Sequence, residues 1–559
     1  MFLIRIRAVC VTGVILALSC WAAQRADGVS FSIGRNFSAS NSTHQASGFI
    51  VPDTMGAVGP NHIGVMINGR WSVYDKNGGF LQGQPLDSFW SDNSGVSLDR
   101  FSFDPRILYD PHSERWYAAA VDNSRDANSF LIGVTASSDP TRGWRRFKID
   151  ADSNDTHWAD FPMLGMNRDV VVVQANMFSI DESQPADVST LVLPKGDLLA
   201  RRPTVANATL WEETSDTNHP GFSAQPVVDH DNSGLPLPLL SSWNKSNGVL
   251  KKSVVAGTPE NPTLRTGGGF IDVAGRTPAP SIDQPGPKAD LESGGSRFRS
   301  NVIMRQHPWR ANPSIWALHG VEFRRIAAME WYEIDSVTDE ILQSGVIADR
   351  DRVEFSYPSI AVNSAGDVVI GFSGARDADN DVDDVFMSTF LVVGESVNGT
   401  TTFGDITQTK AGLADYERLD GSDRNRWGDY SATVVDPTDE NRFWTFQEFA
   451  SDTDRWQIQV TEVIIGPLLL AGDTNNDGLV NLDDLNNVRN HFGDSGPNDG
   501  SLAGDAYPFD GIVGIDDLNG VRNNFGAVAT TVPEPGGLTL AMSIVLTAAA
   551  FRKRHGRTP

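Results

Sequence analysis

A short β unit recurs along most of the chain. Each copy combines an alternating apolar strand, a turn centred on Asp or Asn, and a second strand rich in aromatic residues. The copies begin at Met55, Asp104, Asp160, Ala224, Asn301, Ser356 and Gly428. Their spacing of about 50 to 75 residues is typical of four-stranded blades arranged radially. The repeat therefore predicts that residues 29–465 form an all-β domain of the propeller type.

The number of copies bears on the number of blades. Seven copies favour seven blades, and six blades remain open if the two ends of the region share one. A single β-sandwich is the other all-β architecture, but it does not need about 430 residues. Long helical patterns are scarce in this region. A six- or seven-bladed β-propeller is therefore the favoured fold.

The N-terminus carries an export signal. Arg5 and Arg7 form a positive end, residues 8–18 are apolar, and Ala22 and Ala23 supply a cleavage region of small residues. We therefore predict that residues 1–23 are a secretory signal peptide. A lipoprotein signal is the alternative; it would acylate Cys20, but Ala17 stands where Leu is usual.

Export removes both cysteines, because Cys10 and Cys20 are the two in the chain. Disulfides then cannot stabilise the mature protein, and a large core or a bound metal must do so. The formal net charge of −26 repels phosphate backbones and anionic lipid headgroups. We therefore expect no nucleic-acid partner, whereas divalent cations are favoured.

A duplicated segment follows the β region. The second halves of residues 472–493 and 504–526 align at an offset of 33, and both copies end in a helical pattern. The first copy fits an EF-hand loop, in which alternate oxygen ligands surround a hard cation and a Gly allows the sharp turn. The predicted Ca²⁺ ligands are Asp473, Asn475, Asp477, the carbonyl of Leu479, Asn481 and Asp484.

The second copy departs from this pattern. Ala506, Tyr507, Pro508 and Phe509 replace the early ligands, and an extra residue displaces Asp505. Asp510 and Asp517 remain. The sequence thus predicts one good calcium site, with the second loop a structural copy that binds weakly or not at all.

The duplicated segment, residues 472–526, resembles a type I dockerin. The resemblance implies a small α pair of EF-hand type that plugs into a cohesin-like module. Small hydroxyl residues are common at the tenth and eleventh loop positions of that family, whereas this chain has Leu482-Asp483 and Ile515-Asp516. The segment is therefore interpreted either as a docking module or as a calcium-stabilised spacer between the β region and the C-terminal tail.

The C-terminus reads Val-Pro-Glu-Pro at 532–535, an apolar run at 538–551 and a basic stop at 552–555. This composite resembles the PEP-CTERM sorting signal over residues 532–555. The resemblance implies a hydrophobic sorting helix, an exosortase-type processing enzyme and a bacterium that exports polysaccharide. Fourteen apolar residues span only about 21 Å of helix, against about 30 Å of hydrocarbon, which favours a transient tether over a permanent transmembrane anchor.

The β region itself resembles exported bacterial propellers of the sialidase-like or BNR-like type. The resemblance rests on the segments at 53–75, 103–111, 282–305, 329–335 and 426–444. It implies a ligand site where the inner strands converge at the mouth of the central channel. A Pro- and Gly-rich insertion at 257–295 is expected to form a flexible loop over the rim.

The sequence motifs identify no catalytic residue. A sialidase-type site would need an arginine cluster, a Tyr nucleophile with a Glu partner and an Asp acid/base, usually beside Ser-x-Asp-x-Gly-x-x-Trp boxes, and no strict box is present. Candidates near inner-strand motifs are Arg70, Arg106, Arg305, Arg426, Asp104, Asp160, Asp429 and Tyr430. Arg and Asp beside blade turns more often tie neighbouring blades together.

The favoured function is that of an exported protein of the cell surface or extracellular matrix, whose propeller binds a polysaccharide or a surface protein. The alternative is an extracellular glycoside hydrolase of sialidase-like type, and a purely structural matrix component is a third hypothesis. A carboxylate pair in the channel would favour hydrolysis. A mouth lined by aromatic residues would favour binding, and the candidates are Trp71, Trp116, Trp158, Trp316 and Trp427.

Overall fold

The computed structural model describes residues 30–44, 51–212, 219–242, 248–350, 352–378, 383–466, 471–475, 479–496, 502–506 and 510–527. The predicted signal peptide, the predicted sorting signal and Asp477 lie outside these residues. Within them, none of the helices has the length and apolar character needed to cross a membrane.

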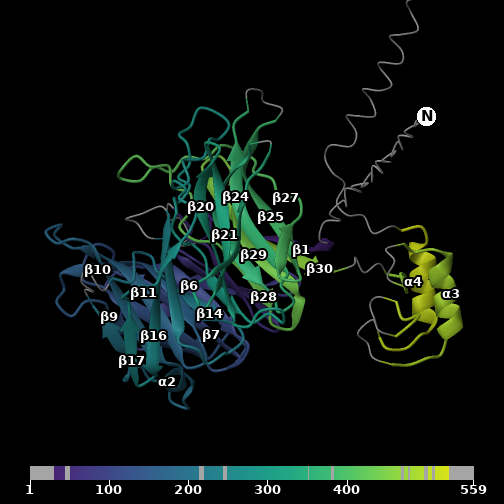
Figure 1. Cartoon of the computed structure of the whole chain (residues 1–559), viewed down its shortest axis with the longest axis horizontal. Helices are drawn as coiled ribbons and strands as arrows, with labels where there is room; N and C mark the ends of the chain where they lie inside the picture. The colour runs from purple at the N-terminus through teal and green to yellow at the C-terminus, as the bar shows by residue number, and fades with distance from the viewer. Residues whose placement is uncertain are drawn as a thin grey trace, which may run out of the picture.

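The region from Phe31 to Ile465 is mostly β, as predicted, and its strands form antiparallel meanders (Figure 1). The first is β2 (Met55–Val58), β3 (His62–Ile67), β4 (Arg70–Asp75) and β5 (Phe80–Pro85). The second is β6 (Ser102–Asp110), β7 (Arg115–Asp122), β8 (Ser129–Thr135) and β9 (Trp144–Asp150). The third is β10 (His157–Met166), β11 (Val170–Ser179), β12 (Asp187–Pro194) and β13 (Thr209–Trp211).

The later meanders repeat this order with small additions. The fourth is β14 (Gln225–Asp229), β15 (Leu237–Ser242) and β16 (Val249–Thr258), with both β17 (Asn261–Arg265) and β18 (Phe270–Asp272) paired to β16. The fifth is β19 (Val302–Arg305), β20 (Ser314–Phe323), β21 (Ile326–Asp335) and β22 (Ile341–Ile347). The sixth is β23 (Glu354–Val362), β24 (Val368–Arg376) and β25 (Val385–Val397), with both β26 (Thr400–Phe403) and β27 (Thr407–Lys410) paired to β25.

The last meander is completed by the N-terminal strand. It consists of β28 (Ala432–Asp436), β29 (Asp439–Asp452), β30 (Arg455–Ile465) and β1 (Phe31–Asn41). Strand β1 pairs antiparallel with β30, from Phe31 opposite Ile465 to Asn41 opposite Gln457. Figure 1 shows the two strands beside each other, although they lie at opposite ends of the β region. This pairing covers an edge of β30 that would otherwise be open.

The first strand of each meander lies innermost. These strands contact one another in the order β28, β2, β6, β10, β14, β19, β23 and back to β28. Strand β14 also pairs in parallel with β10 and β19, with Val227 opposite Val302. The innermost strands therefore form a closed ring, which is the arrangement that radial repetition of blades requires.

Small residues allow the innermost strands to approach closely. A Cβ on Gly165 of β10 would lie 2.2 Å from the carbonyl oxygen of Pro226 in β14. A Cβ on Gly56 of β2 would lie 2.2 Å from the ring of Phe446 in β29. Large aromatic side chains fill the spaces between the sheets, and those fully buried include Trp71, Trp116, Trp316, Trp427, Trp444 and Trp456.

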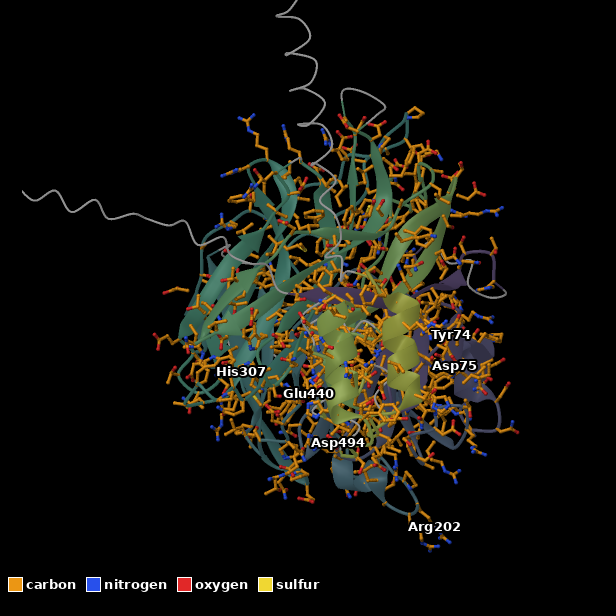
Figure 2. All side chains as sticks on the ribbon, turned by 90° about the vertical axis from the view of Figure 1, so that its right-hand side faces the viewer. Tyr74, Asp75, Arg202, His307, Glu440 and Asp494 are labelled. Atoms are coloured by element: carbon orange, nitrogen blue, oxygen red, sulfur yellow. The ribbon has the colours of Figure 1, made fainter. Side chains whose placement is uncertain are left out.

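The short helices have separate places. Helix α1 (Leu86–Ser91) follows β5, and α2 (Lys195–Leu199) follows β12. The duplicated C-terminal segment forms α3 (Leu482–His491) and α4 (Ile515–Asn524), which pack against each other through Val488 and Val521. Figure 2 shows these two helices side by side, with Asp494 in the loop after α3.

A backbone irregularity recurs where the innermost strands begin. Residues there adopt positive φ angles between 48° and 53°, namely Asp53, Asp104, Phe161, Ser223 and Tyr357. The strand register shifts beside three of them, in β6, β10 and β23. Left-handed backbone is unfavourable for bulky residues, and such strain gathers at functional sites. Residues with this unfavourable backbone therefore gather at one end of the ring.

Candidate active site

Four aspartates from four meanders meet at this end of the ring. Asp53 precedes β2, Asp104 lies in β6, Asp160 lies in β10, and Asp429 precedes β28. Together with the cations Arg297, Arg299 and Arg426 they form a cluster that we call the carboxylate mouth. Asp53, Asp104 and Asp160 sit at or beside residues of positive φ, whereas Asp429 is placed by the loop before β28.

Asp104 is the centre of the cluster. Its Oδ2 accepts hydrogen bonds from the backbone N–H of Phe161 at 3.0 Å and from the hydroxyl of Tyr430 at 3.1 Å. Its own backbone N–H donates to Asn68 Oδ1 at 2.8 Å, and the amide of Asn68 donates to Asp53 Oδ2 at 2.5 Å. Asp104 thereby connects the second meander to the first, the third and the last.

The carboxyl groups of Asp53, Asp104 and Asp160 influence one another's pKa, because their negative charges lie close together. Burial, and then repulsion from Asp104 and Asp429, raises the pKa of Asp53 and that of Asp160 well above the ordinary range. Both side chains therefore hold a proton to higher pH than an ordinary aspartate does.

Asp429 has the opposite character. Burial alone would raise its pKa, but Arg426 and Arg299 outweigh burial and hold the pKa of this carboxyl below its usual value. Arg426 Nη2 donates to Asp429 Oδ2 at 2.7 Å, and Arg299 Nη1 donates to Asp429 Oδ1 at 2.5 Å. Asp429 is therefore an ionised carboxylate held by two guanidinium groups.

Two long loops supply these arginines. Arg299 comes from the loop between β18 and β19, and Arg426 comes from the loop between β27 and β28. Gln284 Nε2 in the first loop donates to the Tyr416 carbonyl in the second at 2.8 Å, and Tyr416 N donates to Gln284 Oε1 at 3.0 Å. Residues 257–295 were expected to form a flexible loop over the rim; this insertion instead contains β17 and β18, and its second part is tied to the neighbouring loop by these reciprocal hydrogen bonds.

The carboxylate mouth has a buried layer and a solvent-facing layer. Asp53 and Asp104 are 1% and 5% exposed, whereas Asp160 and Asp429 are half-buried and Arg297 is exposed. Burial nevertheless raises the pKa of Asp160 and lowers that of Arg297, although both side chains reach solvent. We call this accessible but poorly solvated layer the recess.

A fourth arginine, Arg106, is buried beside these carboxyl groups. The guanidinium carbon of Arg106 is 3.8 Å from the centre of the Tyr430 ring, and the Arg106 side chain is 1% exposed. Arg106 Nε donates to the Pro162 carbonyl at 2.9 Å. Such a stacked, buried arginine offsets the negative charge that Asp429 and its neighbours bring into the interior.

The arrangement can perform acid–base chemistry. A protonated carboxyl and an ionised carboxylate in one recess are the two groups that glycosidic bond cleavage needs. Asp160 can donate a proton, and Asp429 can stabilise developing positive charge or activate water. Tyr430 and Tyr357 are 0% and 2% exposed, and burial raises the pKa of each, so neither matches an accessible tyrosine nucleophile.

The sequence identified part of this site. Arg106, Arg426, Asp104, Asp160, Asp429 and Tyr430 do lie together. Arg70 does not, since its Nε donates to Ser72 Oγ in β4 at 3.1 Å, and Arg305 lines a separate cavity. Asp53, Arg297 and Arg299 were missed. Asp53 stands two residues before the copy at Met55, as Asp104 stands two before Arg106, so aligning the copies would have found it.

Aromatic residues do not line the mouth as a binding platform. Trp71, Trp116, Trp316 and Trp427 are fully buried. Trp158 is half-buried and contacts Phe103 and Phe178. The tryptophans thus serve the core, and carboxyl and guanidinium groups form the polar lining of the recess.

The predicted calcium loop is described except for residues 476–478, which include Asp477. Asp473 and Asp484 are 2% and 0% exposed. Asp484 Oδ1 accepts from Thr474 N at 2.7 Å, and Asp484 Oδ2 accepts from Asn481 N at 2.8 Å. The Asn481 side chain caps α3, while Asn475 and Leu479 are exposed.

The second loop has the same arrangement as the first. Asp505 and Asp517 are 2% and 6% exposed, and Asp517 Oδ1 accepts from Ala506 N at 2.6 Å, as Asp484 accepts from Thr474. Asp505 therefore takes the place of Asp473 despite the extra residue in the sequence. Burial and then the charges of Asp517 and Asp510 raise the pKa of Asp505. A bound cation would relieve this repulsion.

Buried carboxylates of this kind fit a hard cation, because oxygen ligands are those that Ca²⁺ prefers. Over the described part of the chain, however, His, Cys, Asp and Glu side chains form no group of three or more placed to hold a metal ion. Since Asp477 lies outside that part, the calcium site stays a prediction.

Comparison with known proteins gives a limited result. No protein-family model and no curated protein matches the sequence. Among solved structures, a Trypanosoma rangeli sialidase matches with a TM-score of 0.34 and 11% identity over 82% of this chain and 64% of its own. The Dos1 propeller matches with a TM-score of 0.37 and 10% identity over 78% of this chain and 96% of its own.

A Cellvibrio cellulosa alpha-L-arabinanase mutant matches with a TM-score of 0.30 and 10% identity over 63% of this chain and 95% of its own. The chain spans 56% and 64% of the lengths of two Trypanosoma rangeli sialidase structures that it matches. At these TM-scores the likeness carries no argument, so we base the architecture on the strand order and the site on its own geometry.

Proposed function

We propose that residues 29–465 form a seven-bladed, sialidase-like β-propeller closed by β1. The support is the closed ring of innermost strands, each of which begins one antiparallel meander. The pairing of β1 with β30 completes the last meander with a strand from the other end of the region.

We further propose that the propeller is an extracellular glycoside hydrolase acting on polysaccharide. The observation that carries this proposal is the opposite displacement of two carboxyl pKa values in one recess, raised at Asp160 and lowered at Asp429. In this proposal Asp160 is the general acid that protonates the departing glycosidic oxygen. Asp429 is the carboxylate that stabilises the positive charge developing on the sugar, or activates water against it.

The charge of the solvent-facing layer favours an acidic substrate. Arg297 is exposed and makes no hydrogen bond or ion pair with another described residue, while its guanidinium lies 5.8 Å from the centre of the Phe161 ring. The charge of Asp429 is already neutralised by Arg299 and Arg426. The guanidinium of Arg297 is therefore suited to a carboxylate or sulfate on a sugar. We therefore propose a polysaccharide with acidic residues.

The test is to follow new reducing ends when the purified protein is incubated with acidic and neutral bacterial polysaccharides. Hydrolysis of an acidic polymer, lost in Asp160→Asn, would support the proposal. Saturable binding of polymer without new ends would instead favour the non-catalytic surface function predicted first. Hydrolysis that survives in both Asp160→Asn and Asp429→Asn would place the chemistry elsewhere.

We propose that the protein is exported, bound to Ca²⁺ through residues 473–484, and held transiently at the cell surface by its C-terminal sorting helix before release by an exosortase-type enzyme. The support is the sequence of the two ends and the buried aspartates of the helix pair. Mass spectrometry of the protein recovered from its host tests the processing, since intact residues 532–555 in the released form would contradict it.

A docking function of the helix pair has one structural observation in its favour. Leu482 and Ile515 are each 59% exposed at matching positions of the two helices, and Phe492 and Phe525 are 57% and 58% exposed. Exposed apolar side chains repeated in this way suit a protein partner. We therefore propose a cohesin-like module as the partner, tested by titrating one with the wild-type chain and with Leu482→Asn/Ile515→Asn.

A further inference from the structure

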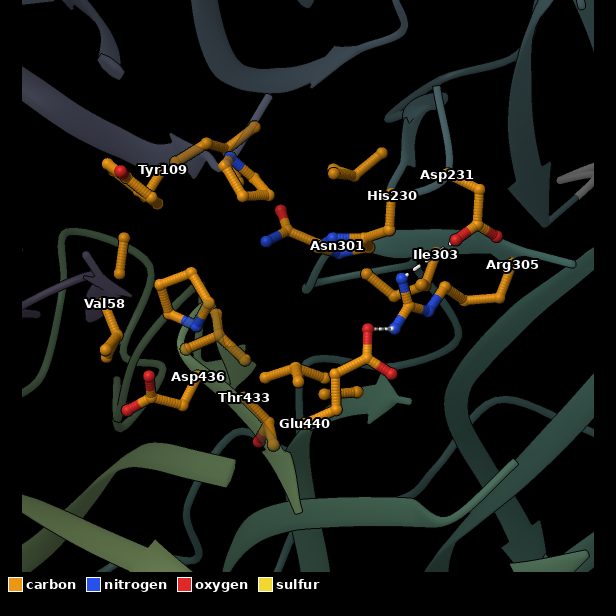
Figure 3. Close-up of a pocket in the computed structure, with 18 of the residues that line it drawn as sticks. Val58, Tyr109, His230, Asp231, Asn301, Ile303, Arg305, Thr433, Asp436 and Glu440 are labelled. Atoms are coloured by element: carbon orange, nitrogen blue, oxygen red, sulfur yellow. Dashed lines mark hydrogen bonds and ion pairs between the residues drawn. The ribbon is translucent and has the colours of Figure 1, made fainter. Parts of the chain in front are cut away.

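A cavity lies at the opposite end of the ring from the carboxylate mouth. It has a volume of about 340 Å³, and its walls come from the far ends of the innermost strands, including Val58 of β2, Tyr109 of β6, Ile303 of β19 and Asp436 of β28. We call it the far pocket (Figure 3). No residue of the carboxylate mouth lines it. Its volume lies at the lower end of the range of roughly 300 to 1,000 Å³ found for small-molecule sites.

The far pocket contains a buried amide without a partner. Asn301 is 5% exposed, and its side chain makes no hydrogen bond with any other described residue. Asn301 directly precedes β19 and lines the cavity together with Ile303 and Arg305 of that strand, and Figure 3 shows Asn301 pointing into the cavity. The amide nitrogen and the carbonyl oxygen of Asn301 are therefore both available to a ligand in the cavity.

His230 adds a second polar group to the same wall. Its ring lies beside Asn301 in Figure 3 and makes no hydrogen bond with another described side chain or backbone group. Burial and then the charge of Arg305 lower the pKa of His230 to about 3. The imidazole is therefore neutral under physiological conditions, with one nitrogen that donates and one that accepts.

Arg305 forms ion pairs with two carboxylates at the rim, while its Nε has no hydrogen-bond partner among the described residues. Arg305 Nη1 donates to Asp231 Oδ1 at 3.0 Å, and Arg305 Nη2 donates to Glu440 Oε1 at 2.6 Å. The remaining oxygen of Glu440 accepts from Ser364 N at 2.9 Å, and that of Asp231 accepts from Gln306 N. Two carboxylates around one guanidinium repel an anion, and neither carboxylate has an oxygen free of a protein donor for an ammonium group.

The chemistry of the far pocket thus selects an uncharged ligand. Asn301 and His230 each offer a donor and an acceptor, and a hydroxyl group is also both. The remaining wall is largely apolar, with Val58, Ile303 and Pro437 among the lining residues. A sugar ring combines hydroxyl groups on its edge with a C–H face that can lie on such a wall.

We propose that the far pocket binds an uncharged sugar of one or two rings, with Asn301 and His230 pairing with its hydroxyl groups. This goes beyond hydrolysis at the carboxylate mouth and does not depend on it. The propeller then has two carbohydrate sites on one axis, an acidic-substrate site at the mouth and a neutral-sugar site at the far end.

The test is a binding assay on the full chain. Neutral disaccharides (cellobiose, maltose and lactose) are titrated by calorimetry and by saturation-transfer NMR, with glucuronic acid and glucosamine as charged counterparts. We expect saturable binding of at least one neutral disaccharide, weakened at least tenfold by Asn301→Leu, which keeps the size of the side chain. His230→Phe provides an independent second variant if the first fails to fold.

Asp160→Asn is the matched control at the other end of the ring and should bind the disaccharide with unchanged affinity. The proposal is overturned if no neutral disaccharide binds, if binding persists in both pocket variants, or if a charged counterpart displaces the disaccharide as effectively as a second neutral sugar does. Loss of binding in Asp160→Asn would place the sugar at the mouth and also overturn it. Failed hydrolysis with intact disaccharide binding would contradict only the hydrolase proposal.

Discussion

The hydroxyl of Tyr430 donates a hydrogen bond of 3.1 Å to Asp104 Oδ2, while the Arg106 guanidinium stacks 3.8 Å from the centre of the Tyr430 ring. Tyr430 precedes β28, whereas Asp104 and Arg106 lie in β6. One tyrosine therefore joins the last meander to the second across the axis of the ring. The contact links closure of the fold directly to the cluster that we propose to be catalytic.

Replacing Asp160 by Asn should remove the proton donor and leave the shape of the site. We expect kcat on an acidic polysaccharide to fall about 10²- to 10⁴-fold, the usual contribution of a general acid. Asp155→Asn is the matched control, since Asp155 is exposed on a turn with φ of 53° that Asn tolerates. Equal rates in the two variants would sink the assignment of Asp160.

The two pKa displacements set the pH dependence of hydrolysis. Asp160 must be protonated, so kcat/KM should fall as the pH rises through its raised pKa. Asp429 must be ionised, so kcat/KM should fall as the pH drops through its lowered pKa. The profile should be a bell whose acidic limb lies below the ordinary carboxyl range and whose alkaline limb lies above it. A profile without an alkaline limb would contradict the role of Asp160.

Glu448 is expected to destabilise the protein as the pH rises. It is 4% exposed, Thr54 Oγ1 donates to its Oε1 at 2.8 Å, and burial raises its pKa well above the ordinary value. Between the unfolded and folded pKa values stability falls by about 1.4 kcal/mol per pH unit, because only the unfolded state ionises.

Glu448→Gln removes this penalty and keeps the neutral shape. Urea unfolding at pH 5, 6 and 7 should show an advantage of the variant that grows with pH. Glu395→Gln, an exposed change in β25, should show a constant difference. A pH-independent difference for Glu448→Gln would mean that Glu448 ionises normally in the folded protein.

Gly165 is required for the contact between β10 and β14. An added Cβ would lie 2.2 Å from the backbone oxygen of Pro226, and backbone in a closed ring cannot move aside easily. Gly165→Ala should therefore lower the free energy of unfolding by about 1–3 kcal/mol. In α2, Gly196→Ala meets nothing within 4 Å and should be neutral or stabilising. Chemical denaturation of both variants measures the difference.

Calcium should order the duplicated helix pair. We expect chelation to expose residues 472–526 to limited proteolysis and Asp477→Ala to weaken calcium binding at least tenfold, because it removes a predicted ligand. Asp483→Ala changes an exposed neighbour and serves as the control. The number of bound ions, measured by calorimetry with and without Asp505→Asn, reports whether the second loop binds as well. Identical digestion with calcium and with chelator would refute the dependence.

The pattern of residues was sufficient to predict much of the fold. Alternating apolar strands around Asp and Asn turns predicted a mostly β region, and that prediction is confirmed between Phe31 and Ile465. The copies also located Asp104, Asp160 and Asp429 near the starts of inner strands. Spacing alone could not show that β1 completes the last meander, because its partner β30 lies more than 400 residues away in the chain.

Chemical composition and periodicity are local properties, and the sequence by itself therefore determined the strands, the turns, the acidic balance and the duplicated loops. Only the tertiary structure decided in which direction the pKa of each of these carboxyl groups is shifted. Asp160 and Asp429 are the same side chain in similar repeat positions, but the pKa of one is raised and that of the other is lowered. The reason is that burial beside Asp104 and pairing with Arg299 and Arg426 arise only when distant segments of the chain meet.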